Sequence, residues 1–156
     1  MKAKIHFYKR DNINTDEIIP ARYLNCDNEA ELAKHAMEDI DKDFTQNVQQ
    51  GDFIIAGKDF GCGSSREHAI WALRGAGVKG IIAKSFARIF YRNAINNGFL
   101  AIECSELNDD LKTGDEIEVN LEQGFFTVND KKYNFSPIPE FVKKIMDKKG
   151  LLNTIE

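Results

Sequence analysis

The sequence lacks the features that mark several large classes of protein. It holds only three cysteines in 156 residues, and these are widely separated and form no CxxC pair: Cys26, Cys62 and Cys104. This spacing argues against a disulfide scaffold and against a self-contained zinc site, and it favours reduced thiols in a cytoplasm. No apolar run approaches the ~20 residues of a membrane helix, and the opening MKAKIHFYKR has no apolar core of a signal peptide.

A block of positive charge is also missing. The net charge is −4 and no long basic run occurs, so we expect no binding to nucleic acid or to membranes, although a local anion site remains compatible with this balance. Hydrophobic residues make up 42% of the chain and charged residues 29%, which is close to the globular average. We therefore expect a single compact domain over residues 1–156.

The middle of the chain alternates between buried strands and amphipathic helices. Short apolar runs predict three strands, over residues 52–57, 78–86 and 99–104. Apolar positions at helical spacing predict two helices between them, over residues 66–76 and 87–98, with glycines at their ends. This order of strands and helices is typical of a parallel α/β unit.

The flanking segments complete the predicted fold. The segments before the α/β unit predict a strand, a polar loop and a helix, over residues 4–9, 10–24 and 29–40, and Pro20 prevents a regular helix within the loop. Alternating apolar residues and turn residues predict an antiparallel meander over residues 115–138, followed by an amphipathic helix over residues 139–150. The expected fold class is α/β, with a mostly parallel central sheet and a C-terminal antiparallel meander.

One glycine-rich stretch, GKDFGCGSSREHAIWAL, leads from a strand into a helix and permits two interpretations. As a structural turn, Gly61 and Gly63 would allow left-handed backbone, while Ser64 and Glu67 would form a capping box. As an anion or carboxylate site, the helix N-terminus would present backbone N–H groups beside the polar side chains of Ser64, Ser65 and Arg66. The order of residues matches neither a Walker loop nor a dinucleotide fingerprint, and the residues alone leave both interpretations open.

Other residues near this stretch carry weaker signals. Cys62 has no partner cysteines at cluster spacing, so we interpret it as a small residue packed in the turn. His68 orients Glu67, packs at an interface or takes part in catalysis, and the last of these is the least favoured. Lys84, Ser85 and Arg88 follow a strand, where α/β sheets place ligands, and therefore form part of the expected cleft. Arg88 and Arg92 could equally lie in solvent or face a partner.

Three segments occur in this order along the chain: DNINTDEIIPARYL, GKDFGCGSSREHAIWAL and GVKGIIAKSFARIFYRNAINNGFLAIE. Together they resemble the small subunit of 3-isopropylmalate dehydratase, a family similar to the mobile C-terminal swivel domain of aconitase. The resemblance covers about residues 5–105, and the length suits the short form of the subunit. It implies a three-layer β/β/α swivel fold.

The resemblance also implies a reaction and a partner. The family isomerises 2-isopropylmalate and 3-isopropylmalate by dehydration and rehydration in leucine biosynthesis, and a 4Fe–4S cluster on a separate large subunit acts as the Lewis acid. No cofactor is then expected on this chain. By this resemblance Ser64 is the catalytic base, Ser65 and Arg66 hold a substrate carboxylate, and the segment around the tyrosine–leucine pair faces the variable group of the substrate: Arg22, Asn25 and Cys26.

The identity of the substrate stays open at this point. Asn25 and Cys26 are uncharged, and an extra buried carboxylate without a counterion is costly, which favours a small apolar group. A sibling hydratase acting on homoaconitate, 2,3-dimethylmalate or another 2-alkylmalate is one alternative. A non-catalytic anion-binding module is a second, and the loop that carries Asn25 could also be a solvated connection.

Overall fold

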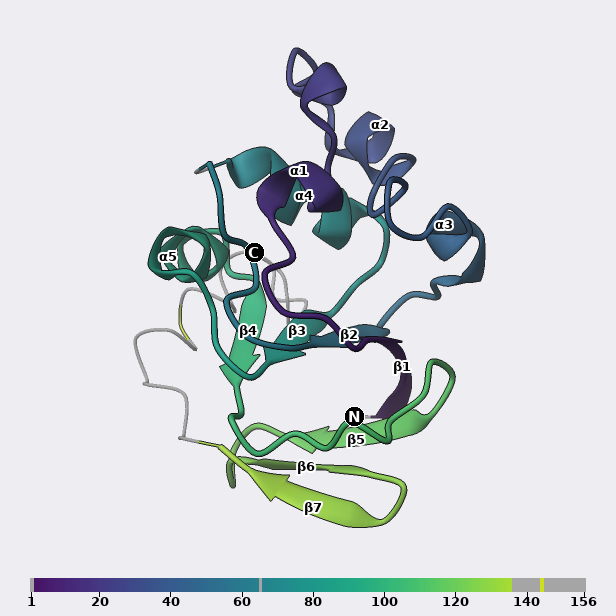
Figure 1. The fold of residues 1–156 in the computed structure, drawn as a ribbon, viewed down its shortest axis with the longest axis vertical. Coiled ribbons are helices and arrows are strands. Elements are labelled where there is room, and N and C mark those ends of the chain that lie inside the picture. The colour runs from purple at the N-terminus through teal and green to yellow at the C-terminus, as the bar shows by residue number, and fades with distance from the viewer. Residues whose placement is uncertain (1, 65, 136–143, 145–156) are drawn as a thin grey trace.

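The computed structural model describes residues 2–64, 66–135 and 144. Seven strands form one curled sheet in the order β4-β3-β2-β1-β5-β6-β7 (Figure 1). The strands are β1 (Lys2–Tyr8), β2 (Phe53–Ala56), β3 (Gly80–Ala83), β4 (Leu100–Glu103), β5 (Glu116–Asn120), β6 (Phe125–Val128) and β7 (Lys131–Asn134). Strands β1 to β4 pair in parallel, and β5 to β7 continue from β1 as an antiparallel meander. The predicted parallel unit and meander are both confirmed.

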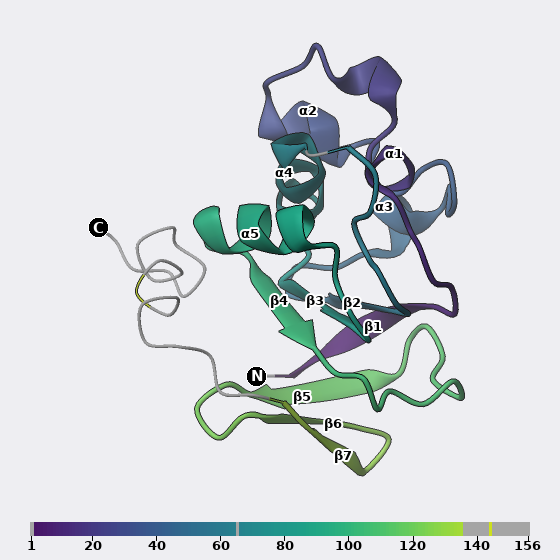
Figure 2. The same cartoon turned by 60° about the vertical axis from the view of Figure 1, so that its left-hand side comes forward.

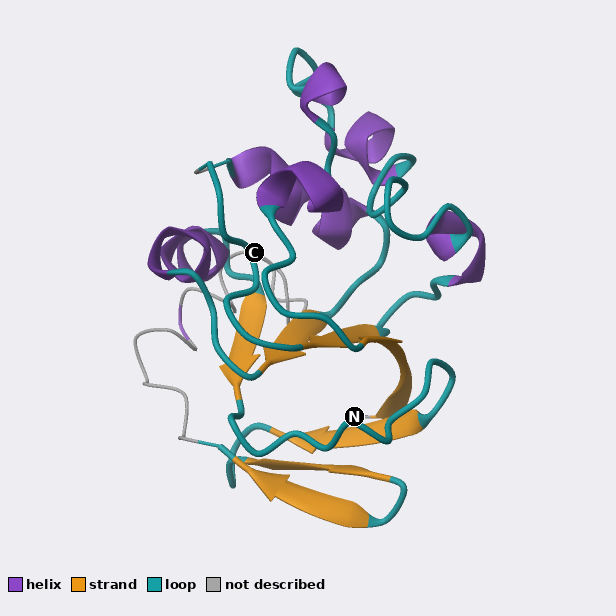
Figure 3. Cartoon of the chain, viewed as in Figure 1, coloured by secondary structure: helices purple, strands orange, loops and turns teal. Residues whose placement is uncertain are grey.

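The helices gather on one face of the parallel strands, and the meander folds beneath the other face (Figures 2 and 3). The helical elements are α1 (Thr15–Ile18), η1 (Ala21–Tyr23), α2 (Glu29–Ala33), α3 (Phe44–Asn47), α4 (Glu67–Gly75) and α5 (Arg88–Asn96). The result is the expected three-layer arrangement of helices, parallel sheet and meander. Within the described ranges, no helix has the length and apolar character that crossing a membrane requires.

Each parallel strand contributes to two apolar cores because successive side chains point to opposite faces. In β2, Ile54 and Ala56 join the core under the helices, whereas Phe53 and Ile55 join the core against the meander. All four residues are buried. This double burial explains why the strand is an unbroken apolar run in the sequence rather than an alternating one.

The N-terminal third departs from the prediction in two places. The helix expected over residues 29–40 ends at Ala33, because Met37 takes a left-handed backbone (φ 62°) and its N–H donates to the carbonyl of Ile18 at 2.7 Å. The expected loop contains the single turn α1, which Asn14 caps and which ends before Pro20. The amphipathic helix predicted over residues 139–150 falls outside the described residues apart from Lys144.

Three loops follow the carboxyl ends of β1, β2 and β3 and lie side by side. The N–H of Gly61 donates to the carbonyl of Ile13 at 2.8 Å, and the N–H of Phe60 donates to the carbonyl of Ser85 at 3.1 Å. The carbonyl of Phe60 in turn accepts from the N–H of Ala87 at 3.0 Å. These bonds extend the sheet beyond its strands and make one platform at the edge where open α/β sheets bind ligands.

Candidate functional site

The glycine-rich loop makes its turn with two left-handed glycines, as predicted. Gly61 has a φ of +85° and Gly63 a φ of +96°. A Cβ on Gly61 would lie 2.2 Å from Cγ of Phe90, whereas a Cβ on Gly63 would meet no atom within 3.4 Å. Gly61 is therefore required by both conformation and close packing against α5, and Gly63 by conformation alone.

The predicted capping box at Ser64 and Glu67 is wrong. The N-cap of α4 is Arg66, its backbone is extended (φ −141°, ψ 117°), and its side chain makes no capping hydrogen bond. Glu67 instead accepts a hydrogen bond from Nδ2 of Asn97 at 3.1 Å. Because the extended backbone at Arg66 delays the helix until Glu67, Ser64 stays outside it and exposed to solvent.

Thr15 fixes the position of the Ser64 backbone. Its N–H donates to the carbonyl of Cys62 at 2.9 Å, and its Oγ1 donates to the carbonyl of Ser64 at 3.0 Å. Thr15 is buried and belongs to the first turn of α1. The sequence analysis did not single it out, although it lies in the DNINTDEIIPARYL segment, because no local pattern tells which distant loop a threonine will bind.

A pocket of about 290 Å³ opens beside Ser64. Its lining includes five of the predicted site residues: Gly61, Gly63, Ser64, Arg66 and Arg88. The start of α5 contributes an apolar wall of Ala87, Ile89 and Phe90, while Thr15 and Asn93 complete the lining. The arrangement places a hydroxyl and a guanidinium around a space next to the N-terminus of α4, which suits a small carboxylate with an apolar part.

Arg66 stands between this pocket and a second one of about 400 Å³. The second pocket shares Arg66 and Asn93 with the first and is also lined by Leu24, Glu67, His68 and Trp71. Leu24 thus brings the YLNC segment to the side of Arg66. The guanidinium of Arg66 is ion-paired with Asp16 of α1, and its side chain is only 18% exposed. Asp16 is a further residue that the sequence analysis missed.

His68 lines the second pocket rather than the pocket of Ser64. Its Nε2 lies 3.7 Å from Oδ1 of Asp27, which is too long for a hydrogen bond, and it has no hydrogen-bond partner among the described residues. The ring also contacts Trp71 at 4.9 Å between centroids. His68 thus lies between α4 and the loop that precedes α2 without a hydrogen bond to that loop.

The other predicted residues have partners elsewhere or stay outside the two pockets. Nη2 of Arg22 binds Glu38 at 2.5 Å and Asp39 at 3.0 Å. Ser85 accepts from the N–H of Asp59 at 2.8 Å and so holds the glycine-rich loop. Asn25 is exposed and Cys26 half-buried, and neither lines either pocket, while Ser65 lies outside the described residues.

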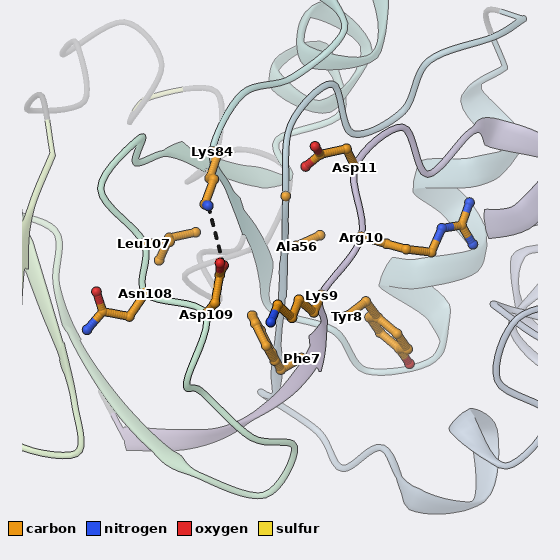
Figure 4. A pocket seen from close by; sticks show the side chains of 11 residues that line it. Phe7, Tyr8, Lys9, Arg10, Asp11, Ala56, Lys84, Leu107, Asn108 and Asp109 are labelled. Atoms are coloured by element: carbon orange, nitrogen blue, oxygen red, sulfur yellow. Dashed lines mark hydrogen bonds and ion pairs between the residues drawn. The ribbon is translucent and has the colours of Figure 1, made fainter.

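Lys84 lines a third pocket, of about 240 Å³, between β1 and the loop after β4. Its Nζ faces Oδ1 of Asp109 at 3.4 Å (Figure 4). Lys84 thus lies on the same edge of the sheet as Ser64 but does not line its pocket.

The three cysteines do not converge. Cys62 sits in the glycine-rich turn, Cys26 contacts the backbone of Asn28, and Cys104 is buried in the core against the meander. Partial burial, together with the nearby carboxylate of Asp59, raises the pKa of the Cys62 thiol, which disfavours the thiolate that a nucleophile or metal ligand needs. Across the described part of the chain, no three candidate ligands come together to hold a metal ion.

Known proteins share this sequence and this fold. The family model of the aconitase C-terminal domain matches residues 4–107. A 3-isopropylmalate dehydratase small subunit 2 from Deinococcus radiodurans is 56% identical over 152 residues, covering 95% of this chain and 72% of that protein. A 3-isopropylmalate dehydratase small subunit from Caldicellulosiruptor saccharolyticus is 52% identical, covering 99% of this chain and 90% of that protein.

A solved structure agrees with these relatives. The crystal structure of a 3-isopropylmalate dehydratase from Methanocaldococcus jannaschii superposes with a TM-score of 0.87 at 42% identity, and covers 97% of this chain and 90% of that one. The match extends over the platform, the glycine-rich loop and the meander alike. The chain therefore belongs to the aconitase C-terminal domain family, within its group of 3-isopropylmalate dehydratase small subunits.

Proposed function

We propose that this chain is the small subunit of a 3-isopropylmalate dehydratase and supplies the base and a carboxylate-binding group of that enzyme. The reaction interconverts 2-isopropylmalate and 3-isopropylmalate by loss and return of water, as a step of leucine biosynthesis in the cytoplasm. The observation that carries the proposal is the placement of Ser64 and Arg66 in one pocket at the start of α4. The names of the relatives, which are all small subunits, support a large partner subunit.

Arg66 would bind a carboxylate of the substrate. A guanidinium presents paired N–H donors that match a carboxylate. Asp16 contacts only Nη1 of Arg66, which leaves further donors for the substrate. Asp16 also holds the guanidinium in place before substrate arrives, which lowers the entropy lost on binding.

Ser64 would accept the proton that leaves carbon. A helix N-terminus stabilises a negative charge by at most ~2 kcal/mol, and one pKa unit corresponds to ~1.4 kcal/mol. The dipole of α4 alone is therefore far too weak to ionise the Ser64 hydroxyl in water. Arg66 and a dry site closed by the large subunit must supply the rest, because charge stabilisation strengthens when water is excluded. We expect the isolated chain to be inert.

The resemblance places a 4Fe–4S cluster on the large subunit, where it would act as a Lewis acid toward the departing hydroxyl. The residues of this chain do not fit such a cluster, because Cys26, Cys62 and Cys104 lie in separate parts of the fold. We therefore assign this chain no step at the cluster. Its contribution is confined to binding the substrate carboxylate, positioning the substrate and moving the proton.

Reconstitution with the cognate large subunit tests the proposal. Ser64→Ala should lower turnover about a hundred- to ten-thousand-fold, the usual contribution of a positioned base, while KM stays near the wild-type value. Ser105→Ala is the matched control, because Ser105 is an exposed serine in the loop after β4, and it should leave turnover unchanged. Arg66→Lys should mainly raise KM, since one ammonium cannot replace the two-pronged guanidinium.

Two outcomes would contradict the proposal. Turnover by this chain without a large subunit would exclude the two-subunit assignment. Near-normal turnover of the Ser64→Ala complex would remove Ser64 as the base and leave the loop as a structural turn that binds an anion.

A further inference from the structure

The first two turns of α5 carry an unusual exposed surface beside the site. Arg88, Ile89 and Arg92 are all exposed, and we call this group the α5 patch. Ile89 is 51% exposed and is the one large apolar side chain in that state within the described ranges. A lone exposed isoleucine is ordinary, so the significance of this one depends on its neighbours.

The two arginines of the patch differ from the other arginines of the chain. Four arginines form ion pairs with carboxylates: Arg10, Arg22, Arg66 and Arg74. Arg88 and Arg92 form none with any residue that the structure describes, although the net charge of the chain is −4. They stand four positions apart and therefore on the same side of the helix as each other. Arginine is also enriched in the centres of protein interfaces.

The patch is continuous with the pocket of Ser64. Arg88 and Ile89 line that pocket, and Ser64 and Gly63 are exposed at its mouth. A partner that excludes water from Ser64 must cover the rim of the pocket, and the first turn of α5 forms part of that rim. The same surface thus combines an apolar side chain, two cations without an ion pair to the described residues, and the border of a site that needs closing.

We propose that the α5 patch is a docking surface for the large subunit, an inference that rests on the proposed function. Ile89 enters an apolar recess of the large subunit, and Arg88 and Arg92 meet acidic side chains around that recess. The patch carries the residue types that such a contact uses, an apolar anchor flanked by planar cations. Docking there also brings the two halves of the active site together.

The affinity of the chain for the cognate large subunit, measured by titration calorimetry, tests this inference. Ile89→Asp should weaken binding by at least about tenfold. The variant loses the apolar surface that docking would bury, which is the exposed half of the Ile89 side chain, and it places a charge against an apolar recess. The variant should fold, since aspartate in the first turn of a helix is favourable. Asn96→Asp is the matched control: it adds the same charge at the exposed end of α5 and should leave the affinity within twofold.

Activity at increasing concentrations of large subunit separates docking from substrate contact. If the α5 patch acts in docking, Arg92→Glu, at a residue that lines neither pocket, weakens binding but recovers the wild-type KM for 2-isopropylmalate once the large subunit is saturating. A raised KM of the Arg92→Glu complex at saturation would overturn the inference, because Arg92 would then act on the substrate site rather than in docking. Suppose that the wild-type complex forms and turns over, but Ile89→Asp binds the large subunit with unchanged affinity. That result would also overturn the inference, and it would leave the proposed function intact.

Two further results concern the assembly itself. If wild-type chain fails to bind any large subunit, the proposed function fails together with the docking surface. If light scattering shows that the chain alone is a dimer and Ile89→Asp makes it a monomer, the patch joins two copies of this chain, which also overturns the inference.

Discussion

Gly61→Ala probes how tightly the glycine-rich loop rests on α5. Gly61 has a left-handed φ of +85°, and a Cβ there would lie 2.2 Å from Cγ, 2.5 Å from Cβ and 2.6 Å from Cδ1 of Phe90. These atoms are near the root of a side chain that is 3% exposed, so Phe90 cannot rotate its far end out of the way. Either the loop or the start of α5 must shift.

The expected loss of stability has two parts. A left-handed backbone costs an alanine about 1–2 kcal/mol, and forcing an extra methyl group into a packed core costs about 1–3 kcal/mol. We therefore expect Gly61→Ala to lower the free energy of unfolding by about 2–5 kcal/mol. That is a large share of the 5–15 kcal/mol typical of whole domains.

Gly63→Ala and Gly114→Ala isolate the first part. Gly63 has a φ of +96°, and a Cβ there would lie 3.5 Å from the nearest atom of a residue other than its chain neighbours. Gly114 has a φ of +100° and open space around it. Both should lose only the conformational part, about 1–2 kcal/mol. Urea unfolding of the three variants gives the comparison. Equal destabilisation of Gly61→Ala and Gly63→Ala would refute the close contact between the loop and Phe90.

Three further predictions concern specificity, pH and a buried pair. Asn25→Arg should move the kcat/KM ratio of the reconstituted enzyme from 2-isopropylmaleate toward homoaconitate by supplying a counterion for a third carboxylate; an unchanged ratio would separate residue 25 from the substrate. The hydrogen bond from Arg10 holds the pKa of Glu17 below its ordinary 4.5, so the pair stabilises the fold above that pH and the stabilisation is lost as pH falls through the lowered pKa. Glu17→Gln should thus lower the free energy of unfolding at pH 7 by less than about 1 kcal/mol, because the pair is partly solvated, and the gap to wild type should shrink as the pH falls below 4.5; a gap that keeps its size over this fall would argue against the pair. Asp52→Ala should cost about 1–3 kcal/mol in urea unfolding, because it leaves the buried Nε2 of His6 without the carboxylate that lies 2.9 Å away; a stability equal to wild type would mean that water replaces the carboxylate.

The strands and long helices of the α/β unit were predictable because local pattern and tertiary role agree there. The apolar run that became β2 is buried on both faces, and the periodic segment that became α5 ends near Gly98, as expected. Prediction failed where a hydrogen bond to a distant residue determined the backbone conformation. Met37 sits in a helical pattern, but its N–H binds the carbonyl of Ile18, and the helix stops before it.

The candidate site was predictable in its residue types but not in its partners. The motif placed Arg66 correctly at a helix start but wrongly made Ser64 the cap of that helix. The surroundings of both residues come from α1, many residues earlier: Thr15 binds the carbonyl of Ser64, and Asp16 pairs with Arg66. Arg22, which the resemblance assigns to the substrate, pairs in the structure with Glu38 and Asp39, which lie beyond a helix. Charge pairing across such separations leaves no periodic signal in a sequence.

The platform under Ser64 is joined in large part by backbone groups. The bonds that link the loops after β1, β2 and β3 run between N–H and carbonyl groups of residues such as Ile13, Phe60 and Ala87. Every residue except proline supplies both groups. Mutations can therefore accumulate in these loops during evolution without dismantling the frame. New side chains over the pocket can be tried one at a time without the frame having to be rebuilt.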